Sequence, residues 1–279
     1  VFVECLSEYY RHGPGALRPV GETVFVESQA EAAKQARTAL VAAAIISHAD
    51  LQLGDGVVPV LEAHRSASPE RFRGIRHACS WHPSEEIREG HSKPPPHLYT
   101  RDDFRAGFAE LHKHGLIFES WGFHTQLAEL AGLARAFPDT PIVLDHVGGP
   151  LGIGPFAGRR EAVFADWQAG IREVAACPNV VVKLGGLAMP INGFGWHHRE
   201  LPPGSEELAA AFGTWFHFCI DQFGTQRCMF ESNFPVDRVS CSYTVLWNAF
   251  KRIAADYSQA QQDAMLHDNA LSIYGIAQA

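Results

Sequence analysis

The sequence predicts an α/β protein whose parallel strands form a (β/α)8 barrel, the TIM barrel. Two observations support this prediction. Short β-branched runs alternate with longer stretches at helical spacing. Several of these runs also end in polar residues, as the strands at the active face of such a barrel do. An open doubly wound sheet could end similarly, but no G-x-G-x-x-G follows the first run.

The individual elements follow from periodicity and from helix start and stop signals. The predicted strands are residues 1–5, 42–50, 74–80, 116–123, 141–147, 179–186 and 227–234. The predicted helices are residues 29–42, 101–115, 125–138, 206–224, 242–258 and 258–275. The second of these helices has an acidic start, apolar residues three and four apart, and a closing glycine. We expect one domain over residues 1–279.

Composition narrows the class of protein. The 279 residues are 46% hydrophobic and carry a formal net charge of -8, so no basic surface is predicted for nucleic acid. No apolar run approaches the length of a membrane span, and no signal peptide is visible. The six cysteines lack C-x-x-C spacing, which indicates reduced thiols in a cytoplasmic enzyme. The expected partner is a small-molecule substrate, and a homo-oligomer is compatible with a barrel of this size.

Polar residues at the strand ends are the candidates for chemistry. His146 follows a strand and precedes two glycines; its functional interpretation competes with a histidine that caps a loop carbonyl. Arg76 and His77 end another strand, where an arginine either clamps a substrate carboxylate or forms a structural ion pair. Lys183 either faces the interior with a pKa lowered by burial or pairs with a carboxylate.

Two connections and three aromatic-ring side chains complete the candidate pocket. Trp121, His124 and Trp196 either line the pocket or belong to packing and surface. The Gly-rich segment 148–161 is either an ordinary loop or a cover over substrate. The segment 189–205 is too long for a plain connection, which favours a lid.

Several motifs together resemble one family. They are LDHVGGPLG (144–152), VVVKLGG (180–186) and RCMFESNFPVD (227–237), with GIRH (74–77) and DNALSIYG (268–275). In this order they resemble the amidohydrolase-related (amidohydrolase 2) family of TIM-barrel hydrolases, in particular its branch of sugar-lactone and muconolactone-type lactonases. The likeness covers nearly the whole chain. It implies an active-site histidine at His146, often a metal ligand, and a divalent metal such as zinc that lowers the pKa of bound water.

The chain departs from the family pattern at its start. Members begin with a strand that ends in H-x-H, whereas VFVEC (1–5) resembles the second strand of the family. We therefore expect either that the sequence is a fragment or that another segment replaces strand one. The pair His112 and His114 ends a predicted helix, where side chains two apart project about 200° apart and cannot readily share an ion. His146 with one carboxylate is few ligands for a catalytic zinc.

The last predicted strand departs as well. Where the family reads G-S-D-W-P, this chain has Glu231-Ser-Asn-Phe-Pro, so Asn233 stands at the position of the catalytic aspartate. An amide cannot accept a proton at neutral pH. Glu231, two residues earlier, shares its strand face about 7 Å away, and Asp237 is a third candidate on the loop.

The leading interpretation is a hydrolase that opens a lactone or a related carbonyl substrate. Glu231 or Asp237 would activate water, while His146, Arg76 and Lys183 polarise the carbonyl or hold a substrate carboxylate. A carbon–carbon lyase, a decarboxylase of the same superfamily, is the first alternative. A catalytically inactive barrel that serves as a binding protein is the second, because the H-x-H is missing and Asn233 replaces an aspartate.

Overall fold

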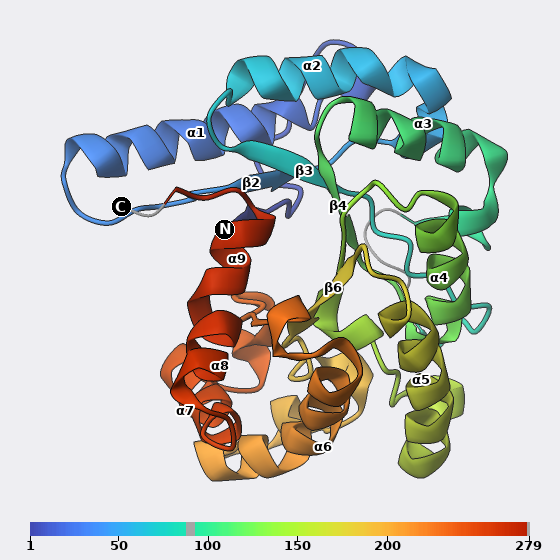
Figure 1. Cartoon of the computed structure of the whole chain (residues 1–279), viewed down its shortest axis with the longest axis vertical. Coiled ribbons are helices and arrows are strands. Elements are labelled where there is room, and N and C mark those ends of the chain that lie inside the picture. The colour runs from blue at the N-terminus through green and yellow to red at the C-terminus, as the bar shows by residue number, and fades with distance from the viewer. Residues whose placement is uncertain (88–92, 278–279) are drawn as a thin grey trace.

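The computed structural model describes residues 1–87 and 93–277. Seven parallel strands form one sheet in the order of the chain (Figure 1). They are β1 (Phe2–Val3), β2 (Ile45–Ser47), β3 (Phe72–Arg76), β4 (Ile117–Ser120), β5 (Ile142–Leu144), β6 (Val180–Leu184) and β7 (Cys228–Phe230). Each lies within or overlaps one predicted strand. The sheet curls about the middle of the molecule with most of the helices outside it, which confirms the α/β barrel class.

The register aligns the carboxyl ends of the strands at one rim. Arg76 of β3 lies opposite Glu119 of β4, and Lys183 of β6 lies opposite Met229 of β7. In the described part of the chain, β1 pairs only with β2 and β7 only with β6. The two outer strands therefore leave a gap in the wall of the barrel, next to the rim that carries the polar side chains.

Nine α-helices are described, and most were predicted. They are α1 (Val20–Gln35), α2 (Val58–Ala67), α3 (Asp102–Lys113), α4 (Leu127–Ala136), α5 (Arg160–Ala175), α6 (Ser205–Phe223), α7 (Tyr243–Ala254), α8 (Gln259–Asp263) and α9 (Asn269–Ile273). The prediction for 29–42 was wrong at both ends, because β-branched residues of 20–26 hide the first turns and the helix has ended by residue 36. A π-helical turn at Ala264–Asp268 joins the last two helices.

Two helices, α2 and α5, were not predicted. In α5 the buried residues Val163, Trp167, Ile171 and Val174 recur at helical spacing, a signal hidden by the glycines that precede it. His112 lies in the last turn of α3 and His114 caps that helix. This confirms the prediction that the two histidines end a helix and do not lie on a strand. No helix among the described residues has both the length and the apolar character needed to cross a bilayer.

Candidate active site

A cavity of about 460 Å³ lies at the gap between β1 and β7. Residues of both outer strands line it, together with the segment after β7 and side chains of α7 and α9. Its charged lining residues are Glu4, Arg76, His146, Lys183 and Glu231. Three of these five residues, Glu4, His146 and Lys183, are buried, and the side chains of Arg76 and Glu231 are 13% and 14% exposed. Their charges therefore interact in a medium that water screens weakly.

An unusual backbone brings His146 into this cavity. Directly after β5, His146 and Val147 adopt φ angles of 54° and 47°, a left-handed conformation that is strained for a β-branched residue. The indole Nε1 of Trp167 donates a hydrogen bond of 2.7 Å to the carbonyl of Val147. The main-chain N–H of His146 donates to Glu231 Oε1 at 3.0 Å. The turn is thus fixed from the helix side and from the cavity side.

The two glycines after β6 make room for this arrangement. A Cβ atom on Gly186 would lie 2.6 Å from the His146 ring, and one on Gly185 would lie 2.4 Å from Glu231 Cγ. Both distances are shorter than any tolerated contact with a rigidly held group. The sequence KLGG therefore places Lys183 on the cavity wall and clears the space in which His146 meets Glu231.

His146 and Glu231 form a carboxylate–histidine pair. The ring Nδ1 lies 2.5 Å from Glu231 Oε1. Burial alone lowers the pKa of His146, but the Glu231 charge outweighs it and raises that pKa above the ordinary histidine value. Burial alone raises the pKa of Glu231, but the charges of His146 and Lys183 lower it below the usual range. The carboxylate is therefore ionised, and the imidazole holds its proton more tightly than a free histidine.

The second ring nitrogen of His146 is the group left for chemistry. Within the described residues no hydrogen bond engages Nε2, and His146 lines the cavity. A carboxylate on Nδ1 fixes the tautomer and orientation of a histidine and stabilises the imidazolium that forms when Nε2 takes a proton. The geometry thus suits proton transfer to or from a molecule in the cavity.

Lys183 lies in a cluster of carboxylates. Its Nζ is 2.6 Å from Glu119 Oε2, 3.0 Å from Asp145 Oδ1 and 3.7 Å from Glu231 Oε2. Burial by itself lowers the pKa of Lys183, but these carboxylates raise it well above the ordinary value. The expectation of a lowered lysine pKa was wrong, because the charges opposite the ammonium outweigh its loss of solvation. The structure shows the alternative, a lysine paired with carboxylates.

Arg76 is held in the same way on the other side of Asp145. Its Nε donates to Glu4 Oε1 at 2.8 Å and its Nη2 donates to the Glu4 carbonyl at 2.6 Å, while Nη1 reaches Asp145 Oδ2 at 3.4 Å. The structure again shows the ion-pair alternative. Contact of Arg76 or Lys183 with a substrate stays a prediction.

Asn233 and Asp237 form a second hydrogen-bonded pair, beside the Glu231–His146 pair. Asn233 Nδ2 donates to Asp237 Oδ1 at 2.8 Å, and the Ala188 N–H donates to Asp237 Oδ2 at 3.4 Å. Burial raises the pKa of Asp237 to about 7. Asn233 lines the cavity whereas Asp237 is fully buried outside the lining. A catalytic role for either residue stays a prediction.

The remaining predicted pocket residues divide by position. The Trp121 ring packs edge-on against His146 with centroids 4.8 Å apart. His77 and His124 are buried, and each accepts a backbone N–H at Nδ1, from Leu51 and Leu151 respectively. Trp196 stacks on Phe194 with centroids 4.3 Å apart. None of these four predicted residues lines the cavity, and their substrate contacts stay predictions.

Besides Asp145, three residues of the charged cluster were missed as site candidates. Glu4 directly follows β1, Glu119 lies on β4, and Tyr274 reaches in from the turn after α9 to donate to Glu119 Oε1 at 2.6 Å. The carboxylates of the first two carried a signal, a polar residue after an apolar run. Tyr274 carried none, because only tertiary structure brings the C-terminal helix to the barrel interior.

The described donor side chains near the cavity do not form a metal site. The parts of the chain that the structure describes contain no group of three histidine, cysteine or carboxylate side chains placed to hold an ion. His146 and Glu231 face each other, and Asp145 and Glu119 face Lys183. These donors do not fit a catalytic zinc with three protein ligands. What the described residues offer is proton transfer by their own side chains, and His146 as a metal ligand stays a prediction.

Comparison with known proteins bears on this geometry. A family model described as Amidohydrolase matches residues 3–276. An uncharacterized protein, y4mH, of Sinorhizobium fredii is 33% identical over 232 residues, which are 83% of this chain and 69% of that protein. An L-fucono-1,5-lactonase of Burkholderia multivorans is 31% identical over 176 residues. That match covers 62% of this chain and 56% of the lactonase, so the chain spans little more than half its length.

A solved structure agrees in fold. The crystal structure of an amidohydrolase from Burkholderia multivorans with bound zinc superposes with a TM-score of 0.70 at 25% identity. The superposition covers 92% of this chain and 79% of that one.

Proposed function

Because this chain belongs to the amidohydrolase family of hydrolases, we propose that it opens a lactone by adding water, with His146 as the general base. The observation that carries the proposal is the Glu231–His146 pair. His146 lines the cavity, its Nδ1 lies 2.5 Å from a carboxylate oxygen, and its Nε2 makes no hydrogen bond among the described residues. The lactonase among the relatives supports the choice of bond. The carboxylate activates water through the histidine and does not take the proton itself.

The proposed step is a transfer of one proton out and back. Nε2 of His146 accepts a proton from water as the water oxygen bonds to the lactone carbonyl carbon. The carbon–oxygen bond of the ring then breaks, and the imidazolium returns the proton to the leaving alkoxide. The product is a hydroxy acid. Glu231 keeps the ring in place and stabilises the imidazolium between the two transfers.

The charge of the cluster favours a neutral substrate. The cluster has more carboxylates than permanent cations. The carboxylates are those of Glu4, Glu119, Asp145 and Glu231, and the cations are Arg76 and Lys183. Each cation already has two carboxylate partners within 3.4 Å, so none is left over to clamp a substrate carboxylate. A neutral lactone that bears hydroxyl groups fits this wall better than an acidic lactone.

A lactone panel tests the proposal. Release of acid is followed with a pH indicator for a neutral sugar δ-lactone and for a γ-lactone that carries a carboxylate, after subtraction of spontaneous opening. We expect faster enzymatic opening of the neutral compound. No hydrolysis above background for any lactone would favour the inactive barrel, and release of carbon dioxide from an aromatic acid would favour the decarboxylase.

Two variants decide which side chain of the last strand matters. Glu231→Gln should be nearly inactive, whereas Asn233→Ala should retain most activity, because the structure joins Glu231 and not Asn233 to His146. The reverse result would remove Glu231 from the mechanism.

A divalent metal, with zinc as the first candidate, remains a separate prediction from the family and from the zinc-bound Burkholderia structure. Metal analysis of the purified protein and activity after chelation check it. One equivalent of bound metal would require ligands beyond those that the described residues bring together.

A further inference from the structure

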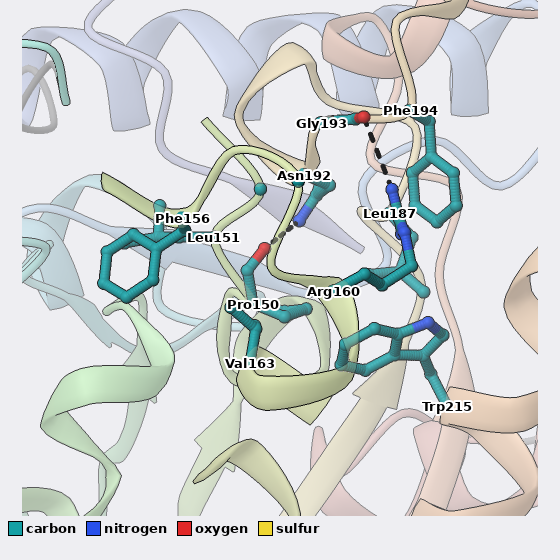
Figure 2. Close-up of a pocket in the computed structure, with 12 residues that line it drawn as sticks. Pro150, Leu151, Phe156, Arg160, Val163, Leu187, Asn192, Gly193, Phe194 and Trp215 are labelled. Atoms are coloured by element: carbon teal, nitrogen blue, oxygen red, sulfur yellow. Dashed lines mark hydrogen bonds between the residues drawn. The ribbon is translucent and has the colours of Figure 1, made fainter. Parts of the chain in front are cut away.

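A second cavity of about 190 Å³ is lined by residues that follow β5 and β6 and by residues of α5 and α6 (Figure 2). The segments 150–158 and 187–194 form its rim, and side chains of α5 and α6 form its base. It shares no lining residue with the active-site cavity. Both segments stood out in the sequence as unusual connections, and the proposed hydrolysis uses neither.

The two segments are fastened to each other, so the cavity has a fixed shape. Gly152 N–H donates to the Ile191 carbonyl at 2.8 Å, and Asn192 Nδ2 donates to the Pro150 carbonyl at 2.8 Å (Figure 2). A Cβ on Gly152 would lie 2.2 Å from the Asn192 carbonyl oxygen, so a glycine is required at this close approach.

Asn192, a lining residue of this cavity, carries a buried acceptor without a partner among the described residues. Its side chain is only 4% exposed, and its Oδ1 has no hydrogen-bond partner among the described residues. A buried polar atom without a partner costs about 1–3 kcal/mol, and such atoms usually meet a bound molecule or water. Because Nδ2 of the same amide is committed to Pro150, the group that fits Oδ1 is a donor, such as a hydroxyl.

Arg160 presents a cation at the same cavity. Its guanidinium lies 4.0 Å from the ring centroid of Phe194, and Nη2 donates to the Gly193 carbonyl at 3.3 Å (Figure 2). Within the described chain no acidic side chain pairs with it. A guanidinium fixed on an aromatic face offers its remaining N–H groups as a planar pair, which matches a carboxylate.

The rest of the wall is apolar and aromatic, with Phe156, Leu187 and Trp215 among the lining side chains (Figure 2). We propose that this cavity binds a small hydroxycarboxylate with an apolar or ring-shaped body. The carboxylate meets Arg160, the hydroxyl donates to Asn192 Oδ1, and the body packs between the aromatic walls. The volume is below that of sites for drug-sized ligands, about 300–1,000 Å³, which limits the ligand to a single small ring or chain.

The ligand class follows from the groups in the cavity and does not depend on the reaction. If the proposed function holds, the product of lactone opening is itself a hydroxycarboxylate, so the site would take molecules of the product class. That connection rests on the proposed function, whereas binding at this cavity does not.

Titration calorimetry with mandelate, which combines a carboxylate, a hydroxyl and a ring, tests the site in the whole protein. We expect saturable binding of one mandelate, and about tenfold weaker binding of phenylacetate, which lacks the hydroxyl, and of mandelamide, which lacks the charge. No binding of mandelate, or phenylacetate binding as tightly as mandelate, would overturn the proposal.

A matched pair of variants locates the binding. Arg160→Gln should weaken mandelate binding about tenfold or more, whereas Arg159→Gln, at an exposed neighbour that does not line the cavity, should change it less than about twofold. Equal loss in both variants would mean that only general charge attracts the ligand. Unfolding midpoints confirm that both variants fold.

A third variant separates this site from the active site. Glu231→Gln should keep mandelate binding while losing lactone hydrolysis, and Arg160→Gln should keep hydrolysis while losing mandelate. Loss of mandelate binding in Glu231→Gln would place the ligand in the active-site cavity and refute the second site. Failure of hydrolysis in the unmodified protein would refute the proposed function and leave the binding result standing.

Discussion

Two sides of one charged cluster use the same kinds of residue for different ends. On the side of β3, β4 and β6, Arg76 and Lys183 are each held by two carboxylates within 3.4 Å. On the side of β5 and β7, His146 lines the cavity and uses one ring nitrogen for Glu231, while the other makes no hydrogen bond among the described residues. A charged group whose partners are all supplied by the protein supports the fold. A group with one donor or acceptor atom left without a partner can react. Charge in a barrel interior therefore does not identify a catalytic residue until its partners are counted.

The largest expected effect comes from removing His146, on the side of β5 and β7. His146→Ala should lower kcat for lactone opening by about 10²–10⁴-fold, the range for loss of a general base. It also leaves the Glu231 carboxylate without its buried partner and should lower the free energy of unfolding. Steady-state rates and urea unfolding measure the two quantities. His112→Ala, an exposed histidine at the end of α3, is the control. Unchanged activity in His146→Ala would show that His146 is not the general base.

Removing Lys183, on the side of β3, β4 and β6, should lower the free energy of unfolding. Lys183→Met leaves Glu119 and Asp145 buried without their shared ammonium, which should lower the free energy of unfolding by about 3–5 kcal/mol. Urea unfolding followed by circular dichroism measures it. Lys113→Met removes an exposed lysine paired with Glu110 and should cost at most about 1 kcal/mol. Similar losses in both variants would show that the buried cluster contributes nothing special.

The pH dependence sharpens the comparison. His146 must be neutral to accept a proton, so kcat should rise with pH through its pKa, which Glu231 holds above the ordinary histidine value. In Glu231→Gln that charge is gone and burial remains, so the pKa should fall below the ordinary value and the rising limb should move to lower pH. The residual kcat should be lower by about 10²-fold or more, since the imidazolium loses its carboxylate. A pH–rate profile of both proteins checks the shift, and an unmoved limb would assign it to another group.

The smallest effect is expected at the edge of the reactive side. Trp121→Leu removes the ring that packs edge-on against His146, a contact worth about 0.5–1.5 kcal/mol. We expect kcat to fall by about 2–10-fold while KM changes little, because the ring orients the base. A rise in KM alone would instead support the predicted contact between Trp121 and substrate.

Much of the fold could be predicted from the sequence, because strand runs and helical faces are local patterns. All seven strands lie where the sequence indicated, and His146, Lys183 and Glu231 were recognised as polar strand ends. The start of α1 was wrong because a β-branched segment forms helix when one face is buried. Sequence analysis could not choose between substrate clamp and ion pair for Arg76, because the choice depends on Glu4, which is 72 positions away.

The sequence by itself determined which strands end in charge and where glycines leave space, since both are properties of one segment and its neighbours. Only the tertiary structure decided which charges meet. It joined Glu231 to His146 across 85 positions and Tyr274 to Glu119 across 155. It also decided between the two alternatives for Lys183, which pairs with carboxylates that raise its pKa. The physical reason is that the pKa of a side chain, and whether its atoms have partners, depend on distances to groups far along the chain. The sequence pattern does not contain those distances.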